Sequence, residues 1–160
     1  MRVRLSTRER DALRSLPRQL LPVLTGEHEL GAPGTPLRDR LFPSAYADDP
    51  LAEIEYRELV GSQVQELRVA ALRTFARTLE GGVTRRLLWT VELDAEEATA
   101  WLSAVNDARL TLAMVAGITS EEQWGDGPDP DDSTSIMLYY LGWLEEQFVA
   151  ALTGELDPRL

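Results

Sequence analysis

Two arginines stand on helical faces that are otherwise apolar, and these are the residues of the chain best placed to do chemistry. At 100° per residue, Arg109 falls within the apolar arc of a helix predicted over residues 95–116. Arg68 falls within a similar arc over residues 63–79. A buried guanidinium keeps its proton and must be paired or hydrogen-bonded. Two of them could together clamp a carboxylate or a phosphate.

Other polar residues are predicted to join these arginines in one cluster. Gln147 lies within the apolar face of a helix predicted over residues 134–152, and Asn106 lies at the edge of the 95–116 face. The acids and hydroxyls expected to reach the arginines are Asp48, Glu55, Asp107, Glu146, Tyr46 and Tyr56. Three interpretations stay open: a salt-bridge network that fixes helix register, arginine stems whose heads reach water, or a small-anion site.

The usual motifs of catalysis and metal binding are missing from the sequence. There is no Cys, and the single His28 sits in a Gly- and Pro-rich loop, where we expect it to be exposed. Phosphate-binding, dinucleotide-binding, nucleophile-elbow and zinc-protease motifs do not occur. A run of loop acids lacks the spacing of a calcium loop: Asp126, Asp129, Asp131 and Asp132. We therefore assign no catalytic residue, no metal ligand and no cofactor.

The elements that position the cluster are predicted to be helices. Capping boxes at Ser6/Glu9, Ser62/Gln65 and Asp94/Glu97 start three of them, and Asp49-Pro50 starts another. The predicted helices cover residues 7–16, a segment beginning at Pro17, 50–60, 63–79, 95–116 and 134–152. Gly61 is expected to separate the third helix from the fourth.

One segment does not fit the helical pattern. Residues 85–93 are short and rich in β-favouring side chains, which predicts an extended segment or a single strand without a partner. The predicted fold is all-α: one domain over residues 1–160, built as an irregular orthogonal bundle of five to six helices with at most this one extended segment.

Composition narrows the classes of partner. The chain has 160 residues and a net charge of −11, which argues against nucleic acid and anionic membranes. No run is long and apolar enough to cross a membrane, and the N-terminus lacks an apolar signal core, so we expect a cytoplasmic protein. Residues 1–18 are the exception in charge, with six Arg against two acids.

Four segments resemble a known family. They are RLFPSAYADDP (40–50), EYR (55–57), WLSAVNDARL (101–110) and LGWLEE (141–146). Together they are similar to an uncharacterised actinobacterial family, a domain of unknown function often encoded beside the Clp protease adaptor. This resemblance implies a link to regulated proteolysis. Some members carry a label as transcriptional regulators, and the family supplies no catalytic residues.

The sequence is consistent with three functions. The first is a non-enzymatic protein-interaction or regulatory module with a protein partner, linked by the resemblance to Clp-type proteolysis. The second is a transcriptional regulator that uses the Arg-rich N-terminal helix. The third is a small-anion-binding protein or enzyme at an Arg68/Arg109 cluster. A homodimer is left open. The loop over residues 41–50 is expected to be packed, with Phe42 and Tyr46 plugging the bundle.

Overall fold

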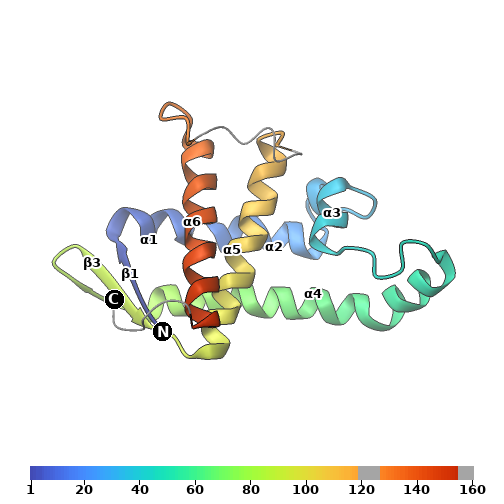
Figure 1. The fold of residues 1–160 in the computed structure, drawn as a ribbon, viewed down its shortest axis with the longest axis horizontal. Coiled ribbons are helices and arrows are strands. Elements are labelled where there is room, and N and C mark those ends of the chain that lie inside the picture. The colour runs from blue at the N-terminus through green and yellow to red at the C-terminus, as the bar shows by residue number, and fades with distance from the viewer. Residues whose placement is uncertain (119–126, 155–160) are drawn as a thin grey trace.

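The computed structural model describes residues 1–118 and 127–154. In chain order its elements are β1 (Arg2–Ser6), α1 (Thr7–Arg14), α2 (Leu16–Thr25), a 3₁₀ turn η1 (Glu29–Gly31), α3 (Pro36–Leu41), α4 (Pro50–Gly81), β2 (Val83–Arg85), β3 (Leu88–Glu92), α5 (Ala95–Val115) and α6 (Ser133–Thr153). Helix α5 packs against both α4 and α6, and α5 and α6 run across α4 (Figure 1). No helix in the described ranges has both the length and the hydropathy to cross a membrane.

The described chain is mostly helical, as predicted, but a small antiparallel sheet corrects the all-α prediction. Its strand order is β1-β3-β2, so β3, within the predicted extended segment 85–93, has a partner on each side. The extended conformation was predicted, but β1 was missed. Its Arg-Val-Arg-Leu alternation buries Val3 and Leu5 and leaves Arg2 and Arg4 exposed, as period-2 geometry requires.

The turn between β2 and β3 adopts a conformation that most side chains avoid. Arg86 and Leu87 have φ angles of 49° and 69°. Positive φ at both central residues belongs to a type I′ hairpin turn, which normally takes Asn-Gly. A non-glycine residue in such a region costs about 1–3 kcal/mol. The side chain of Leu87 is nevertheless 80% exposed, so the hairpin presents a basic and apolar tip to solvent.

Helix α4 is continuous, which corrects the predicted break at Gly61. It spans 32 residues and is therefore about 48 Å long. Glycine inside a helix costs about 1 kcal/mol relative to alanine, and the neighbouring turns outweigh that cost. The start is as predicted, because Asp49 accepts hydrogen bonds from the N–H groups of Leu51 and Ala52. The capping boxes at Ser6 and Asp94 also form as predicted.

The centre of the core is aromatic. The ring of Trp101 lies 4.7 Å from Phe75, 5.6 Å from Phe148 and 6.3 Å from Trp89, centroid to centroid. Its Nε1 donates to Thr78 Oγ1 at 2.7 Å, which satisfies the one polar atom of this buried indole.

The buried face of α6 corrects the predicted one. The residues that α6 buries are Leu138, Leu141, Leu144 and Phe148. The helical wheel of residues 134–152 predicts Trp143 and Ile136 on the buried face together with Leu144 and Phe148, but Trp143 is 50% exposed and Ile136 is also exposed. Helix α6 is apolar over most of its circumference, so the wheel could not separate the leucine side from the aromatic side.

Gly82 allows the sheet to close onto α4. A Cβ at this position would lie 2.3–2.4 Å from three atoms of the buried Trp89 ring. We expect Gly82→Ala to lower the free energy of unfolding by about 1–3 kcal/mol, because it overpacks the core. Gly81→Ala is the matched control, since a Cβ there meets nothing within 4 Å. Urea unfolding of both variants tests this, and equal stability of the two would contradict it.

Candidate functional site

Arg68 and Asp107 form an ion pair between α4 and α5. Arg68 Nη1 donates to Asp107 Oδ1, and the side chains of Arg68 and Asp107 are 22% and 1% exposed. Asp107 Oδ2 has no hydrogen-bond partner among the described residues. Burial raises the pKa of Asp107 to about 6, although the charge and the hydrogen bond of Arg68 act in the opposite direction. Arg68 therefore offsets only part of the cost of burying the ionised carboxylate of Asp107.

The ring of Phe42 contacts both Arg68 and a second arginine, Arg38. The guanidinium carbons of Arg38 and Arg68 lie 3.9 Å and 5.3 Å from the centroid of the Phe42 ring. Arg38 also donates to Leu24 O and Gln65 Oε1, both at 3.1 Å. Burial, with the charge of Arg57 as a smaller contribution, lowers the pKa of Arg38. Phe42 packs against the core as predicted. Arg38 was not singled out from the sequence, and Gln65 was named only for a capping box.

Arg109 lies on the other side of α5. Asp107 and Arg109 are two residues apart, or about 200° around the helix, so one faces α4 and the other α6. Arg109 Nε lies 2.5 Å from Glu145 Oε2, a charge contact without hydrogen-bond alignment. The pair lines a hollow of about 510 Å³ together with Trp143 and Gly142. Each of the two predicted arginines thus already engages its own carboxylate.

The other predicted cluster residues lie in different places. Asn106 and Gln147 are half-buried, while Asp48, Glu55 and Glu146 are exposed. Tyr46 is 50% exposed and makes an edge contact with Tyr56 at 5.9 Å instead of plugging the bundle.

The loop before α4 is fastened by an acid that the sequence did not highlight. Glu53 Oε2 accepts from the N–H groups of Ala45 and Tyr46, at 2.9 Å each. Its other oxygen pairs with Arg57 at 2.5 Å. The Arg57 hydrogen bond, helped by those of the loop, lowers the pKa of Glu53 to about 2. Glu53 therefore has a structural role.

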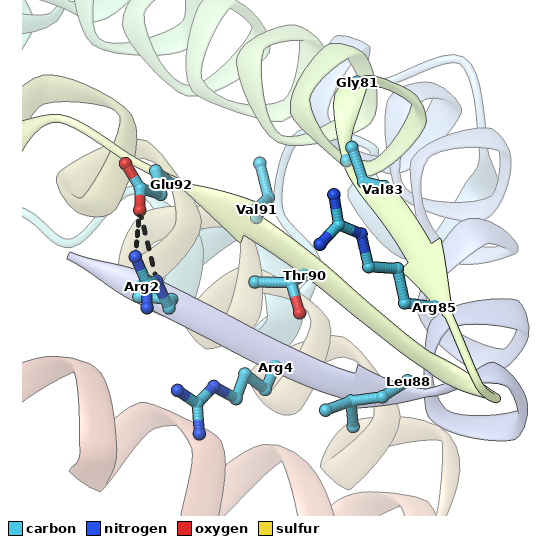
Figure 2. Close-up of a pocket in the computed structure, with 10 residues that line it drawn as sticks. Arg2, Arg4, Gly81, Val83, Arg85, Leu88, Thr90, Val91 and Glu92 are labelled. Carbon is cyan, nitrogen blue, oxygen red and sulfur yellow. Dashed lines mark hydrogen bonds and ion pairs between the residues drawn. The ribbon is translucent and has the colours of Figure 1, made fainter.

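The outer face of the sheet carries a third group of arginines, which we call the basic face (Figure 2). It consists of Arg2, Arg4, Val83, Arg85, Leu88, Thr90 and Glu92, which line a hollow of about 620 Å³ together with Gly81, Gly82 and Val91. The register sets Thr90 opposite both Arg4 and Val83, and Leu88 opposite Arg85. Residues opposite each other in an antiparallel sheet share a face, so the three arginines and Thr90 lie on the same outer face of the sheet.

Two of these arginines have positive charges that are not neutralised locally. Arg2 pairs with Glu92 at 2.5 Å, and the hydrogen bond and charge of Arg2 lower the pKa of Glu92. Within the described part of the chain, Arg4 and Arg85 have no ion-pair partner. In a chain of net charge −11, the basic face is a local concentration of the opposite sign.

Two of the three arginines of α1 are engaged elsewhere. Arg10 donates to Leu79 O at 2.8 Å and 3.0 Å and lies 5.3 Å from the Trp89 ring centroid. Arg14 pairs with Glu80 at 2.7 Å. Both side chains therefore hold α1 against the C-terminal end of α4, where cations are favoured. Arg8, the third arginine of α1, is exposed and has no ion-pair partner among the described residues.

The described residues contain no group of three or more His, Asp or Glu side chains that could hold a metal ion. Asp129 and Asp132 accept hydrogen bonds from nearby backbone N–H groups at the start of α6. Asp126 lies outside the described residues. His28 is exposed, as predicted, and its Nδ1 accepts from Leu30 N at 3.2 Å to cap η1.

Comparison with known proteins places the chain by family alone. No curated protein and no solved structure matches it. A family model described as a domain of unknown function (DUF2017) matches residues 1–152. That range includes the sheet, the basic face and the Arg68–Asp107 pair. The chain therefore belongs to the DUF2017 family.

Proposed function

We propose that this chain is a non-enzymatic interaction module and that its basic face binds an acidic segment of a partner protein. The observation that carries the proposal is the pair Arg4 and Arg85, which line an open hollow and have no ion-pair partner among the described residues. Charge of one sign concentrated in a concave surface attracts a ligand of the opposite sign.

An extended peptide suits this surface better than a nucleic-acid backbone does. Arg2 and Arg4 are two residues apart on one strand, so their side chains emerge about 6.8 Å apart. Acids at alternate positions of an extended peptide have the same spacing. The exposed apolar side chains of Val83, Leu87 and Leu88 lie beside the arginines and would contact apolar residues of that peptide. The net charge of −11 disfavours a polyanion as large as duplex DNA.

The strained hairpin supports the same proposal. Backbone strain is found at functional sites more often than elsewhere. Here the strain at Arg86 and Leu87 fixes a basic residue and an exposed leucine at the tip of the hairpin.

The resemblance to proteins encoded beside the Clp adaptor suggests which process the partner serves. We propose that it belongs to regulated proteolysis. An acidic segment of a substrate or of an adaptor would satisfy the chemistry of the basic face. Binding of purified adaptor to the chain, measured with and without Arg85→Glu, tests this narrower statement. Affinity that is independent of Arg85 would reject it.

The basic face itself is tested with a fluorescent peptide of alternating Glu and Leu. Anisotropy should report binding that weakens with salt, and Arg85→Glu should weaken it about tenfold by replacing an attraction with a repulsion. Arg18→Glu makes the same change in net charge at an exposed position on α2 and is the control. If both variants bind the peptide equally, the basic face is not the site. If duplex DNA of matched length binds more tightly than the peptide, the regulator function replaces this one.

A further inference from the structure

Helix α4 presents an apolar stripe to solvent on the side away from the core. We call Leu59, Gln63, Leu67 and Ala70 the α4 stripe; all four are exposed. Leu59 and Leu67 are 72% and 70% exposed, and they lie 80° apart on the helix. The residues that α4 buries are Leu72, Phe75, Thr78 and Leu79, and Leu72 and Leu79 lie almost opposite the stripe. In Figure 1, α5 and α6 cross the part of α4 near its C-terminal end, and its N-terminal part extends beyond them.

The burial of α4 is uneven along its length. No residue from Pro50 to Ala71 is fully buried, although these residues make up two thirds of the helix. Long helices derive most of their stability from packing an apolar face, because intrinsic propensity contributes little. A leucine stripe on such a segment is what a second helix would cover. Single exposed leucines are ordinary, but spacings of four, four and three residues are those of helix–helix contacts.

The stripe is complementary to itself. If two copies of α4 lie antiparallel with a two-fold axis near Gln63, Leu59 of each copy meets Leu67 of the other. Glu55 and Arg73 are eighteen residues apart, or five full turns, so both lie on the same flank of the stripe. In an antiparallel pair, like flanks face each other. Glu55 of each copy therefore faces Arg73 of the other.

Neither charge has an ion-pair partner among the described residues. Within one chain the two are about 27 Å apart along the axis, so they cannot pair with each other.

We propose that the α4 stripe joins two copies of this chain in an antiparallel homodimer, with Glu55–Arg73 ion pairs at both ends. An overlap of about twenty residues buries on the order of 1,000 Å², the lower end for specific interfaces. The surface is distinct from the basic face, so the dimer does not depend on the function proposed above.

Sedimentation velocity of the full chain between about 1 and 100 µM tests the dimer. We expect concentration-dependent dimerisation for the wild type and a loss of at least about a hundredfold in affinity for Leu59→Glu/Leu67→Glu. Ile54→Glu is the matched control, because Ile54 is 54% exposed on the opposite side of the helix. Far-UV circular dichroism and a melting curve confirm that each variant is folded.

A charge swap makes the test specific for the antiparallel arrangement. Glu55→Arg alone and Arg73→Glu alone should each weaken the dimer about tenfold, because each places like charges face to face. The double variant Glu55→Arg/Arg73→Glu restores opposite charges at both ends and should recover the affinity. A wild type that is monomeric at 100 µM would overturn the proposal. So would a double variant as weak as the single variants, or a control as disruptive as the stripe variant.

Discussion

Arg68→Met is expected to lower the free energy of unfolding by about 3–5 kcal/mol at pH 8, because it leaves the carboxylate of Asp107 buried without its counter-charge. The side chain of Asp107 is 1% exposed, and Oδ2 already lacks a partner among the described residues, so Arg68 supplies the only ion pair of this buried carboxylate there. Arg68 also lies against Phe42, so its removal loosens the loop before α4 as well. Urea unfolding followed by circular dichroism measures the effect.

Arg14→Met is the comparison for this experiment. It breaks an ion pair with Glu80 in which the two side chains are 45% and 56% exposed, and it should cost less than about 1 kcal/mol. Similar losses for the two variants would mean that the Arg68–Asp107 pair is solvated like a surface pair. If Arg68→Met is as stable as the wild type, the Arg68–Asp107 pair is better interpreted as a ligand site.

Asp107→Asn is expected to change how stability depends on pH, by about 3 kcal/mol. In the folded protein the pKa of Asp107 is raised from 3.8 to about 6. A raised pKa means that the folded state holds the proton more tightly than the unfolded state does. The stability it contributes is present below pH 4 and is lost as the pH rises through 6. About two pKa units at 1.36 kcal/mol each give the size of the loss.

The asparagine variant lacks that loss. The difference in unfolding free energy, variant minus wild type, should therefore rise by about 3 kcal/mol between pH 4 and pH 8. Taking the difference removes the contribution of other titrating groups. Asp48→Asn, at an exposed position, is the control for the substitution itself. A difference that stays flat from pH 4 to pH 8 would show that Asp107 is ionised in the folded protein throughout that range.

Local signals in the sequence predicted most helix starts and one of the buried contacts. Capping boxes act within four residues, which is why Ser6 and Asp94 were placed correctly. An arginine on an apolar face needs a nearby acid, and Asp107 was among the acids named for Arg68. The single cluster did not follow from this reasoning, because a helical wheel gives the direction of a side chain and not the neighbour it meets. Asp107 and Arg109 face different helices.

The sheet was harder to predict because all three strands are short and β1 is distant in sequence from β3. Strands β2 and β3 form a local hairpin, but the turn residues Arg86 and Leu87 carry none of the usual turn signals. The other partner of β3 is β1 at the N-terminus. Its alternation of arginines with Val3 and Leu5 covers only five residues, which is too short to predict a strand firmly. The basic face escaped notice for the same reason, since it exists only when these two regions meet.

The pairing of β1 with β3 affects the order in which parts of the chain fold during synthesis. Arg2 pairs with Glu92, ninety residues later, and the Met1 amino group donates to Leu93 O at 2.7 Å. At about 5–20 residues per second, the ribosome needs roughly 5–18 s to make the stretch that separates them. During that interval β1 has no strand to join, and its Val3 and Leu5 remain accessible to other chains. Helices α1 and α2 can form early, but the sheet forms only after the hairpin has been made, which makes β1 the segment most in need of protection in the nascent protein.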